Sequence, residues 1–119
     1  MATTVTASVR VIDGAHVHAA SRNVSELLAF ARDRAVATGQ RTAVRFDGLH
    51  HRVLVHSGHD TVAKLSLHDD AGVSLSASRD SLSYQSSGLG YGAANLRVIV
   101  SRGAAQDTIT VSRLGRVRR

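Results

Sequence analysis

The hydrophobic pattern of this chain changes its period at Gly39, and no other feature constrains the fold as strongly. Over residues 15–38 the apolar side chains recur at helical spacing and fall on one stripe. The members of this stripe are Val24, Leu27, Leu28, Ala31 and Ala35. After Gly39 the period is two, with Thr42, Val44 and Phe46 on one face. The pattern predicts an amphipathic helix that ends at a left-handed glycine cap and leads directly into a strand.

The start of this helix is less sharply marked than its end. The side opposite the apolar stripe is polar and carries Arg22, Glu26, Arg32 and Asp33. Two starts fit these residues, because Asp13 is a good N-cap and the helix also fits a beginning near Ser21.

Strands follow the helix to the end of the chain. Asp47-Gly48 predicts a tight hairpin turn, because glycine tolerates the positive φ of primed turns, and residues 51–55 are the expected partner strand. Further strands are expected at residues 62–67, 73–77, 81–84, 96–100 and 108–111. Residues 85–95 carry Gly88, Gly90 and Gly92 and predict a loop. One helix and about seven short strands without βαβ alternation predict an α+β domain, with the helix packed on antiparallel sheets.

Composition limits the core and the chemistry. The 119 residues suit one domain, and with two Phe, two Tyr and no Trp the core must be built from small aliphatic side chains. The absence of cysteine excludes disulfides, thiol nucleophiles and thiolate metal sites. No apolar run approaches the roughly 20 residues that span a bilayer.

The net charge of +6 comes almost entirely from arginine, because Lys64 is the one lysine among 15 basic residues. Arginine binds phosphate and carboxylate groups bidentately, so polyanions are candidate partners. A genomic preference for arginine codons would give the same composition with no functional meaning, and composition leaves both explanations open.

Residues 25–46 resemble the helix-to-strand junction of the GspH/FimT family of type II secretion pseudopilins and type IV minor pilins. In that family the helix carries Ala-Arg-x-x-Ala-Val, which residues 31–36 match, and it ends at glycine. Residues 82–89 are similar to the family's strand and turn that end in Gly, and residues 108–118 to its closing strand with a Gly-Arg ending. The resemblance implies a pilin-like fold and a non-enzymatic subunit that assembles with other pilin subunits and needs no cofactor.

The resemblance also implies a division of the chain. Family members carry a leader, a prepilin-peptidase site and a long apolar helix, and these residues show none of them. We therefore expect residues 1–14 to be the stub of a longer helix, with Met1 added, and residues 15–119 to be the globular domain. The complete subunit would be anchored in the inner membrane before it enters a pilus or pseudopilus in the periplasm and at the cell surface.

The C-terminal segment is the strongest candidate site, with four arginines in residues 113–119. In an extended strand Arg116 and Arg118 point to one face, and Gly115 lets a phosphate approach closely. Arg113 and Arg119 support this patch, and Arg97 and Arg102 are candidate extensions of it.

The Gly115–Arg118 stretch is similar to the Gly-Arg-x-Arg ending of FimT-type minor pilins that bind DNA in natural transformation. The resemblance implies sequence-independent contact with the DNA phosphate backbone, and no aromatic residues interleave with these arginines for base stacking. Three alternatives stay open: a solvated terminal strand, pairing with acidic groups of neighbouring subunits, and a GspH-like pseudopilin that acts by protein contacts.

Other candidate sites are weaker. The histidines His50, His51, His56 and His59 form the one metal-like cluster, but their spacing fits no named zinc site, so we predict no metal site. Residues 88–92 lack the lysine of a phosphate-binding loop, and Asp69-Asp70 is typical of a solvated turn. With no nucleophile elbow, we predict no enzyme; a small hydrolase or a metal-binding domain that uses the histidines is the rival class.

Overall fold

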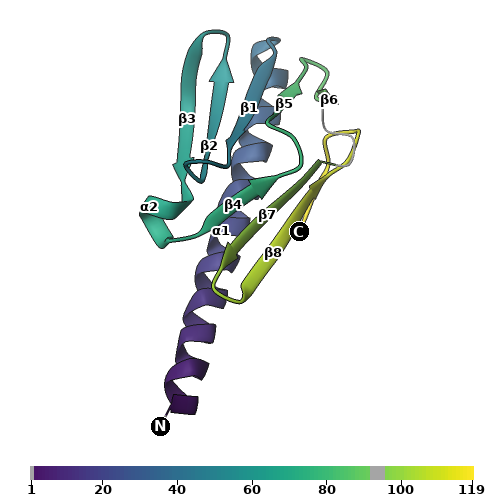
Figure 1. Ribbon diagram of the computed structural model, residues 1–119. Coiled ribbons are helices and arrows are strands. Elements are labelled where there is room, and N and C mark those ends of the chain that lie inside the picture. Colours follow the sequence, from purple (N-terminus) through teal and green to yellow (C-terminus); the bar gives the residue numbers. More distant parts are fainter. Residues whose placement is uncertain (1, 92–95) are drawn as a thin grey trace.

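One long helix supports two antiparallel sheets in the computed structural model, which describes residues 2–91 and 96–119 (Figure 1). The helix α1 is Ala2–Thr38 and the short helix α2 is Leu67–Ala71. The first sheet has the order β3-β2-β1-β5-β6. Its strands are β1 (Thr42–Asp47), β2 (Arg52–Ser57), β3 (Asp60–Ser66), β5 (Ser81–Tyr84) and β6 (Gly90–Tyr91). The second has the order β4-β7-β8-β9 and consists of β4 (Ser74–Ala77), β7 (Leu96–Arg102), β8 (Ala105–Val111) and β9 (Val117–Arg118).

The helix α1 begins earlier than the two starts that its residue pattern suggests. It is continuous from Ala2, so a start at Asp13 or Ser21 is wrong, while its end at Thr38 and the positive φ of 69° at Gly39 confirm the predicted cap. Asp13 lies inside the helix, and its carboxylate does not cap it: Oδ1 lies 3.1 Å from Nε of Arg102. The first turns extend beyond both sheets (Figure 1). Within the described residues, no helix is both long and apolar enough to cross a membrane.

The predicted apolar stripe of α1 faces the sheets. Val24, Leu28, Ala31 and Ala35 are fully buried, and Leu27 packs partly against the same core. The strands supply mainly Val and Leu, so the core is aliphatic as predicted. Tyr84 is its largest fully buried side chain.

The β1–β2 connection differs from the tight turn predicted at Asp47-Gly48. Asp47 and Arg52 form the last pair of the ladder, so residues 48–51 make a longer loop and β2 begins at Arg52 instead of His51. The positive φ falls on His51, at 52°, and not on Gly48. The carboxylate of Asp47 explains this choice, because it accepts a hydrogen bond from the His50 amide at 3.2 Å and closes the loop locally.

Three further elements were mispredicted. Leu67 belongs to α2 and not to a strand, and that helix also contains Asp69 and Asp70, which were expected in a turn. The strands β6 and β9 raise the number found in the described residues above the predicted seven. Strand β6 lies in the predicted loop 85–95, of which residues 92–95 are outside the described residues.

Candidate functional site

Three neighbouring strands of the second sheet bring two distant arginines into one row. In register, Arg97 of β7 pairs with Thr110 of β8, and Thr110 pairs with Arg118 of β9. Their neighbours Val98, Val111 and Val117 point the other way, into or against the core. Because adjacent strands lie about 4.8 Å apart, the backbones of Arg97 and Arg118 are separated by about 10 Å on the exposed face.

Arg97 is held at the edge of this row by the end of β4. Its amide donates to Oγ of Ser78 at 2.9 Å, and its carbonyl accepts from the Ser78 amide at 2.9 Å. The backbone that carries the guanidinium is therefore fixed on both sides, by β8 and by Ser78.

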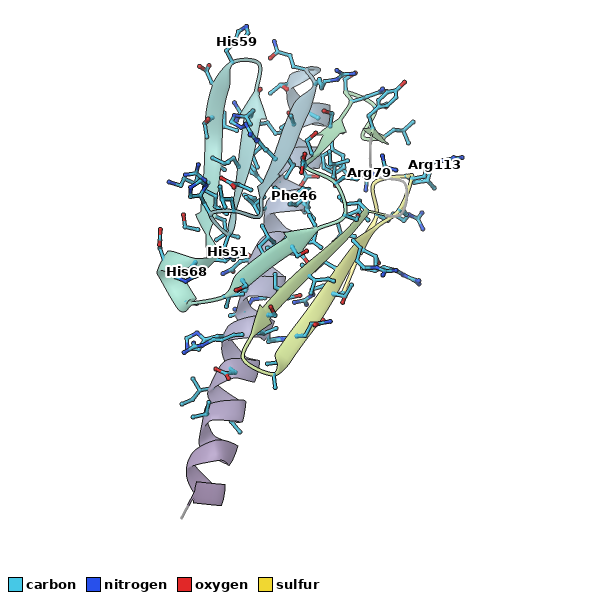
Figure 2. The ribbon with its side chains drawn as sticks, in the orientation of Figure 1. Phe46, His51, His59, His68, Arg79 and Arg113 are labelled. Carbon is cyan, nitrogen blue, oxygen red and sulfur yellow. The ribbon has the colours of Figure 1, made fainter. Side chains whose placement is uncertain are left out.

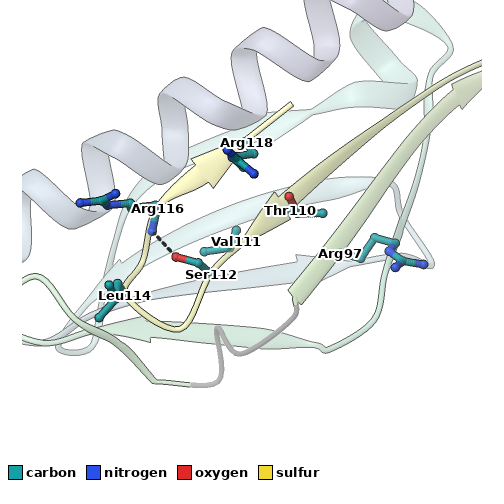
Figure 3. Close-up of a pocket in the computed structure, with 7 residues that line it drawn as sticks. All are labelled: Arg97, Thr110, Val111, Ser112, Leu114, Arg116 and Arg118. Atoms are coloured by element: carbon teal, nitrogen blue, oxygen red, sulfur yellow. Dashed lines mark hydrogen bonds between the residues drawn. The ribbon is translucent and has the colours of Figure 1, made fainter.

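A tight turn joins β8 to β9 and places Arg116. The amide of Gly115 donates to the Ser112 carbonyl and the amide of Ser112 donates to the Arg116 carbonyl, each at 2.9 Å. The amide of Arg116 also donates to Oγ of Ser112 at 3.2 Å (Figure 3). Gly115 has φ 84°, which L-residues rarely adopt, so glycine is required for the turn.

Gly115 approaches other parts of the protein closely. A Cβ at this position would lie 3.0 Å from Cε1 of Tyr84 and 3.1 Å from the carbonyl oxygen of Gly88. Gly115 is also buried. Gly115 therefore seats the turn against the first sheet, and its part in phosphate approach stays a prediction.

The row and the turn together form an open groove of about 550 Å³ (Figure 3). It is lined by Arg97, Thr110, Val111, Ser112, Leu114, Arg116 and Arg118. Among these described residues none is acidic, and no ion pair in the described part of the chain involves any of the three arginines. The groove therefore offers three guanidinium groups and two hydroxyl groups to an anionic ligand.

The other predicted arginines do not line this groove. Arg102 lies at the opposite end of β7, where Nε pairs with Asp13 at 3.1 Å and an NH1 donates to the Ala71 carbonyl at 3.1 Å. Arg113 lines a separate cavity beside Tyr91. Arg119 is exposed at the end of the chain. The four C-terminal arginines are consequently divided by the turn instead of forming one patch.

The histidines predicted as a cluster are separated by the length of β2. His59 lies at the tip of the β2–β3 hairpin, and His51 lies at the other end, beside α2 (Figure 2). The ring of His51 stacks on His68, with centroids 5.7 Å apart, a contact that the sequence did not reveal. Among the described residues, no group of His, Cys, Asp or Glu is arranged to hold a metal ion.

Among the residues that the structure describes, the pKa values of Asp47 and Tyr84 are shifted. Partial burial acts to raise the pKa of Asp47, but hydrogen bonds from the His50 side chain and amide and from Arg52 outweigh it and lower the pKa to about 2. Burial raises the pKa of Tyr84 to about 12, against the opposing charge of Arg32. Neither group lines the groove.

Sequence reasoning missed Thr110 and Ser112 as lining residues. The alternation of residues 108–111 places Thr110 on the outward face, so that signal was available. The alignment of Arg97 with Arg118 across Thr110 could not be read from the sequence, because register across β7, β8 and β9 is set by the folded sheet.

Comparisons with known proteins identify the family. The family model described as type II transport protein GspH matches residues 20–115. A comparison with curated proteins gives no significant match. The minor pilin FimU of Pseudomonas aeruginosa superposes with a TM-score of 0.71 at 12% identity, covering 86% of each chain. The minor pseudopilin EpsH of the Vibrio cholerae type 2 secretion system superposes with a TM-score of 0.67 at 16% identity, covering 87% of this chain and 94% of EpsH.

These matches confirm the resemblance carried by residues 25–46, 82–89 and 108–118. They also confirm the predicted pilin-like α+β fold, since both solved structures cover most of the chain despite low identity. The family match begins within α1 and extends through strands β1 to β8 to Gly115. The chain therefore belongs to the GspH family.

Proposed function

We propose that this chain is a minor pilin that binds DNA without sequence preference through the groove of Arg97, Arg116 and Arg118. The observation that carries the proposal is that three arginines from β7, the β8–β9 turn and β9 line one open groove with no carboxylate among its described lining residues. In this proposal the chain is a structural subunit and not an enzyme. Uptake of DNA in natural transformation is the process that we assign to it.

Binding would be dominated by the phosphate backbone. Each guanidinium presents a planar fork of donors that matches two phosphate oxygens, and Thr110 and Ser112 add hydroxyl donors between the arginines. Neutralising three phosphates of a duplex predicts a slope of about −2.7 in log K against log salt.

Fluorescence anisotropy with a labelled DNA duplex at several salt concentrations tests this proposal. The triple variant Arg97→Gln, Arg116→Gln, Arg118→Gln should lose most of the affinity and nearly all of the salt slope. A charge-matched control is Arg22→Gln with Arg45→Gln and Arg79→Gln, which removes three exposed arginines outside the groove. It should bind nearly as well as the parent.

Equal loss in both triple variants would show that net charge, and not the groove, binds DNA. No binding by the parent at low salt would reject DNA binding altogether. That result would favour the alternative, a GspH-like pseudopilin of a type II secretion system in which the same surface contacts proteins. The exposed Leu114 at the groove suits such a contact.

Assembly of the proposed subunit involves the leading turns of α1. We propose that residues 1–14 continue a membrane helix in the complete protein, and that residues 15–119 form the domain displayed from the fibre. Support comes from Val9, Val11 and Ile12, which are exposed although apolar. Because the chain has no cysteine, Val11→Cys can be cross-linked selectively in assembled fibres. It should cross-link to other pilin subunits, whereas Arg22→Cys should do so less.

A further inference from the structure

Tyr91 presents an exposed aromatic ring beside the turn that forms the groove. The residue is 62% exposed, whereas Tyr84, the other tyrosine of the chain, is fully buried. The guanidinium carbon of Arg41 lies 5.8 Å from the ring centroid, so a cation steadies the ring. An exposed ring held in this way is suited to stacking against another planar group.

The ring belongs to a small cavity with mixed chemistry. About 190 Å³ of space is lined by Gln85, Leu89, Gly90, Tyr91 and Arg113. The aromatic ring offers a stacking face, the Gln85 amide offers both a donor and an acceptor, and Arg113 offers positive charge. A nucleobase attached to a phosphate needs these same contacts: a stacking surface, hydrogen bonds at its edge and a cation for its phosphate.

The cavity and the groove share the turn of residues 112–116. Arg113 lines the cavity, whereas its neighbours Ser112 and Leu114 line the groove. A strand of nucleic acid whose phosphates occupy the groove therefore needs to pass only over this turn to bring a base to Tyr91.

The relative position of the two sites is fixed by packing between two turns. Residues 85–89 form a turn closed by Gln85 N–H to the Leu89 carbonyl at 2.9 Å and Gly88 N–H to the Gln85 carbonyl at 2.8 Å. The carbonyl of Gly88 then lies against Gly115 of the other turn. Tyr91 is held on the same edge because it pairs with Ser83 in the ladder of β5 and β6.

We propose that Tyr91 is a stacking subsite for an unpaired base, so that the preferred ligand is single-stranded DNA whose phosphates lie in the groove. The proposal rests on the proposed function and names its substrate class. In a duplex the bases are already stacked and paired, and extruding one costs free energy, so a duplex would gain only the phosphate contacts.

The test compares a short oligothymidylate with an abasic oligonucleotide of the same length, which has the same phosphates but no bases. The parent should bind the oligothymidylate about 5- to 100-fold more tightly, the range expected for stacking one base. Tyr91→Ala should bind both oligonucleotides equally, with the salt slope of the parent, because stacking releases no counterions. Tyr91→Phe should keep the preference of the parent, since the ring remains.

A second readout follows tyrosine emission, because the chain has no Trp and two Tyr. In a Tyr84→Phe variant only Tyr91 emits, and the oligothymidylate should quench it while the abasic strand should not. Equal parent affinity for both strands would overturn the stacking subsite and leave phosphate binding intact. Failure of the parent to bind either strand at low salt would instead reject the proposed function. Loss of preference in Tyr91→Phe would assign the effect to the hydroxyl and overturn stacking.

Discussion

Replacing Gly115 with alanine should destabilise the domain by about 2–5 kcal/mol, through two separable costs. The first is conformational, because φ is 84° and an L-residue in the left-handed region costs about 1–2 kcal/mol. The second is steric, because the new Cβ would lie 3.0 Å from Cε1 of Tyr84 and 3.1 Å from the Gly88 carbonyl oxygen. Tyr84 is fully buried and the Gly88 oxygen belongs to the backbone, so neither atom can shift without a loss of stability. Overpacking of this kind costs about 1–3 kcal/mol.

Gly58→Ala is the matched control for the conformational cost alone. Gly58 has φ 63°, close to that of Gly115, and a Cβ there would meet no described atom within 4 Å. Urea unfolding followed by far-ultraviolet circular dichroism gives the free energy of unfolding of both variants. Gly58→Ala should lose about 1 kcal/mol and Gly115→Ala at least about 1 kcal/mol more.

Equal losses in the two variants would refute the steric part of this reasoning. In that case the turn of residues 112–116 would not be seated firmly on Tyr84 and Gly88. The fixed position of Tyr91 beside the groove, on which base stacking depends, would lose its structural support.

Three further predictions concern contacts that hold the fold together. Nδ1 of His51 accepts a hydrogen bond from the buried Leu75 amide at 3.0 Å, so His51→Ala should cost about 1–3 kcal/mol in urea unfolding. His51→Asn should cost less, because Asn tolerates the positive φ and offers an acceptor. Asp13→Asn should lower the free energy of unfolding by about 1 kcal/mol, and by much less in an Arg102→Gln background, which a double-mutant cycle measures. Burial raises the pKa of Tyr84 from 10.0 to about 12, so the unfolded chain ionises first and stability falls between these pH values. The parent should lose about 2 kcal/mol more over this window than Tyr84→Phe, and parallel pH profiles of the two would contradict this.

The fold was predictable where the hydrophobic pattern itself decides the outcome. The stripe that contains Val24 and Leu28 and the alternation of Val44 and Phe46 are local, and each reports which face is buried. The prediction of the helix start was wrong because the side chain of Asp13 can either cap a helix or pair with a distant arginine. Asp13 is a good helix cap by its residue type, but in the folded chain its carboxylate is held by Arg102, and no local pattern reveals a partner so distant in sequence.

The same limit explains the candidate site. Four arginines in residues 113–119 suggest one patch, yet the turn at Gly115 directs Arg113 toward Tyr91 and leaves Arg116 and Arg118 in the groove. Arg97 joins them through strand register alone, with Thr110 between it and Arg118. Charge density along the sequence therefore suggested one surface at the C-terminus, whereas the place of the candidate extension Arg97 depends on strand register. If single-stranded DNA is the ligand, the arginines set how strongly binding depends on salt, while Tyr91 sets the preference for unpaired bases. The turn of residues 112–116 separates the groove from the cavity at Tyr91. A substitution of a groove arginine should therefore change the salt dependence, and a substitution of Tyr91 should change the preference for unpaired bases.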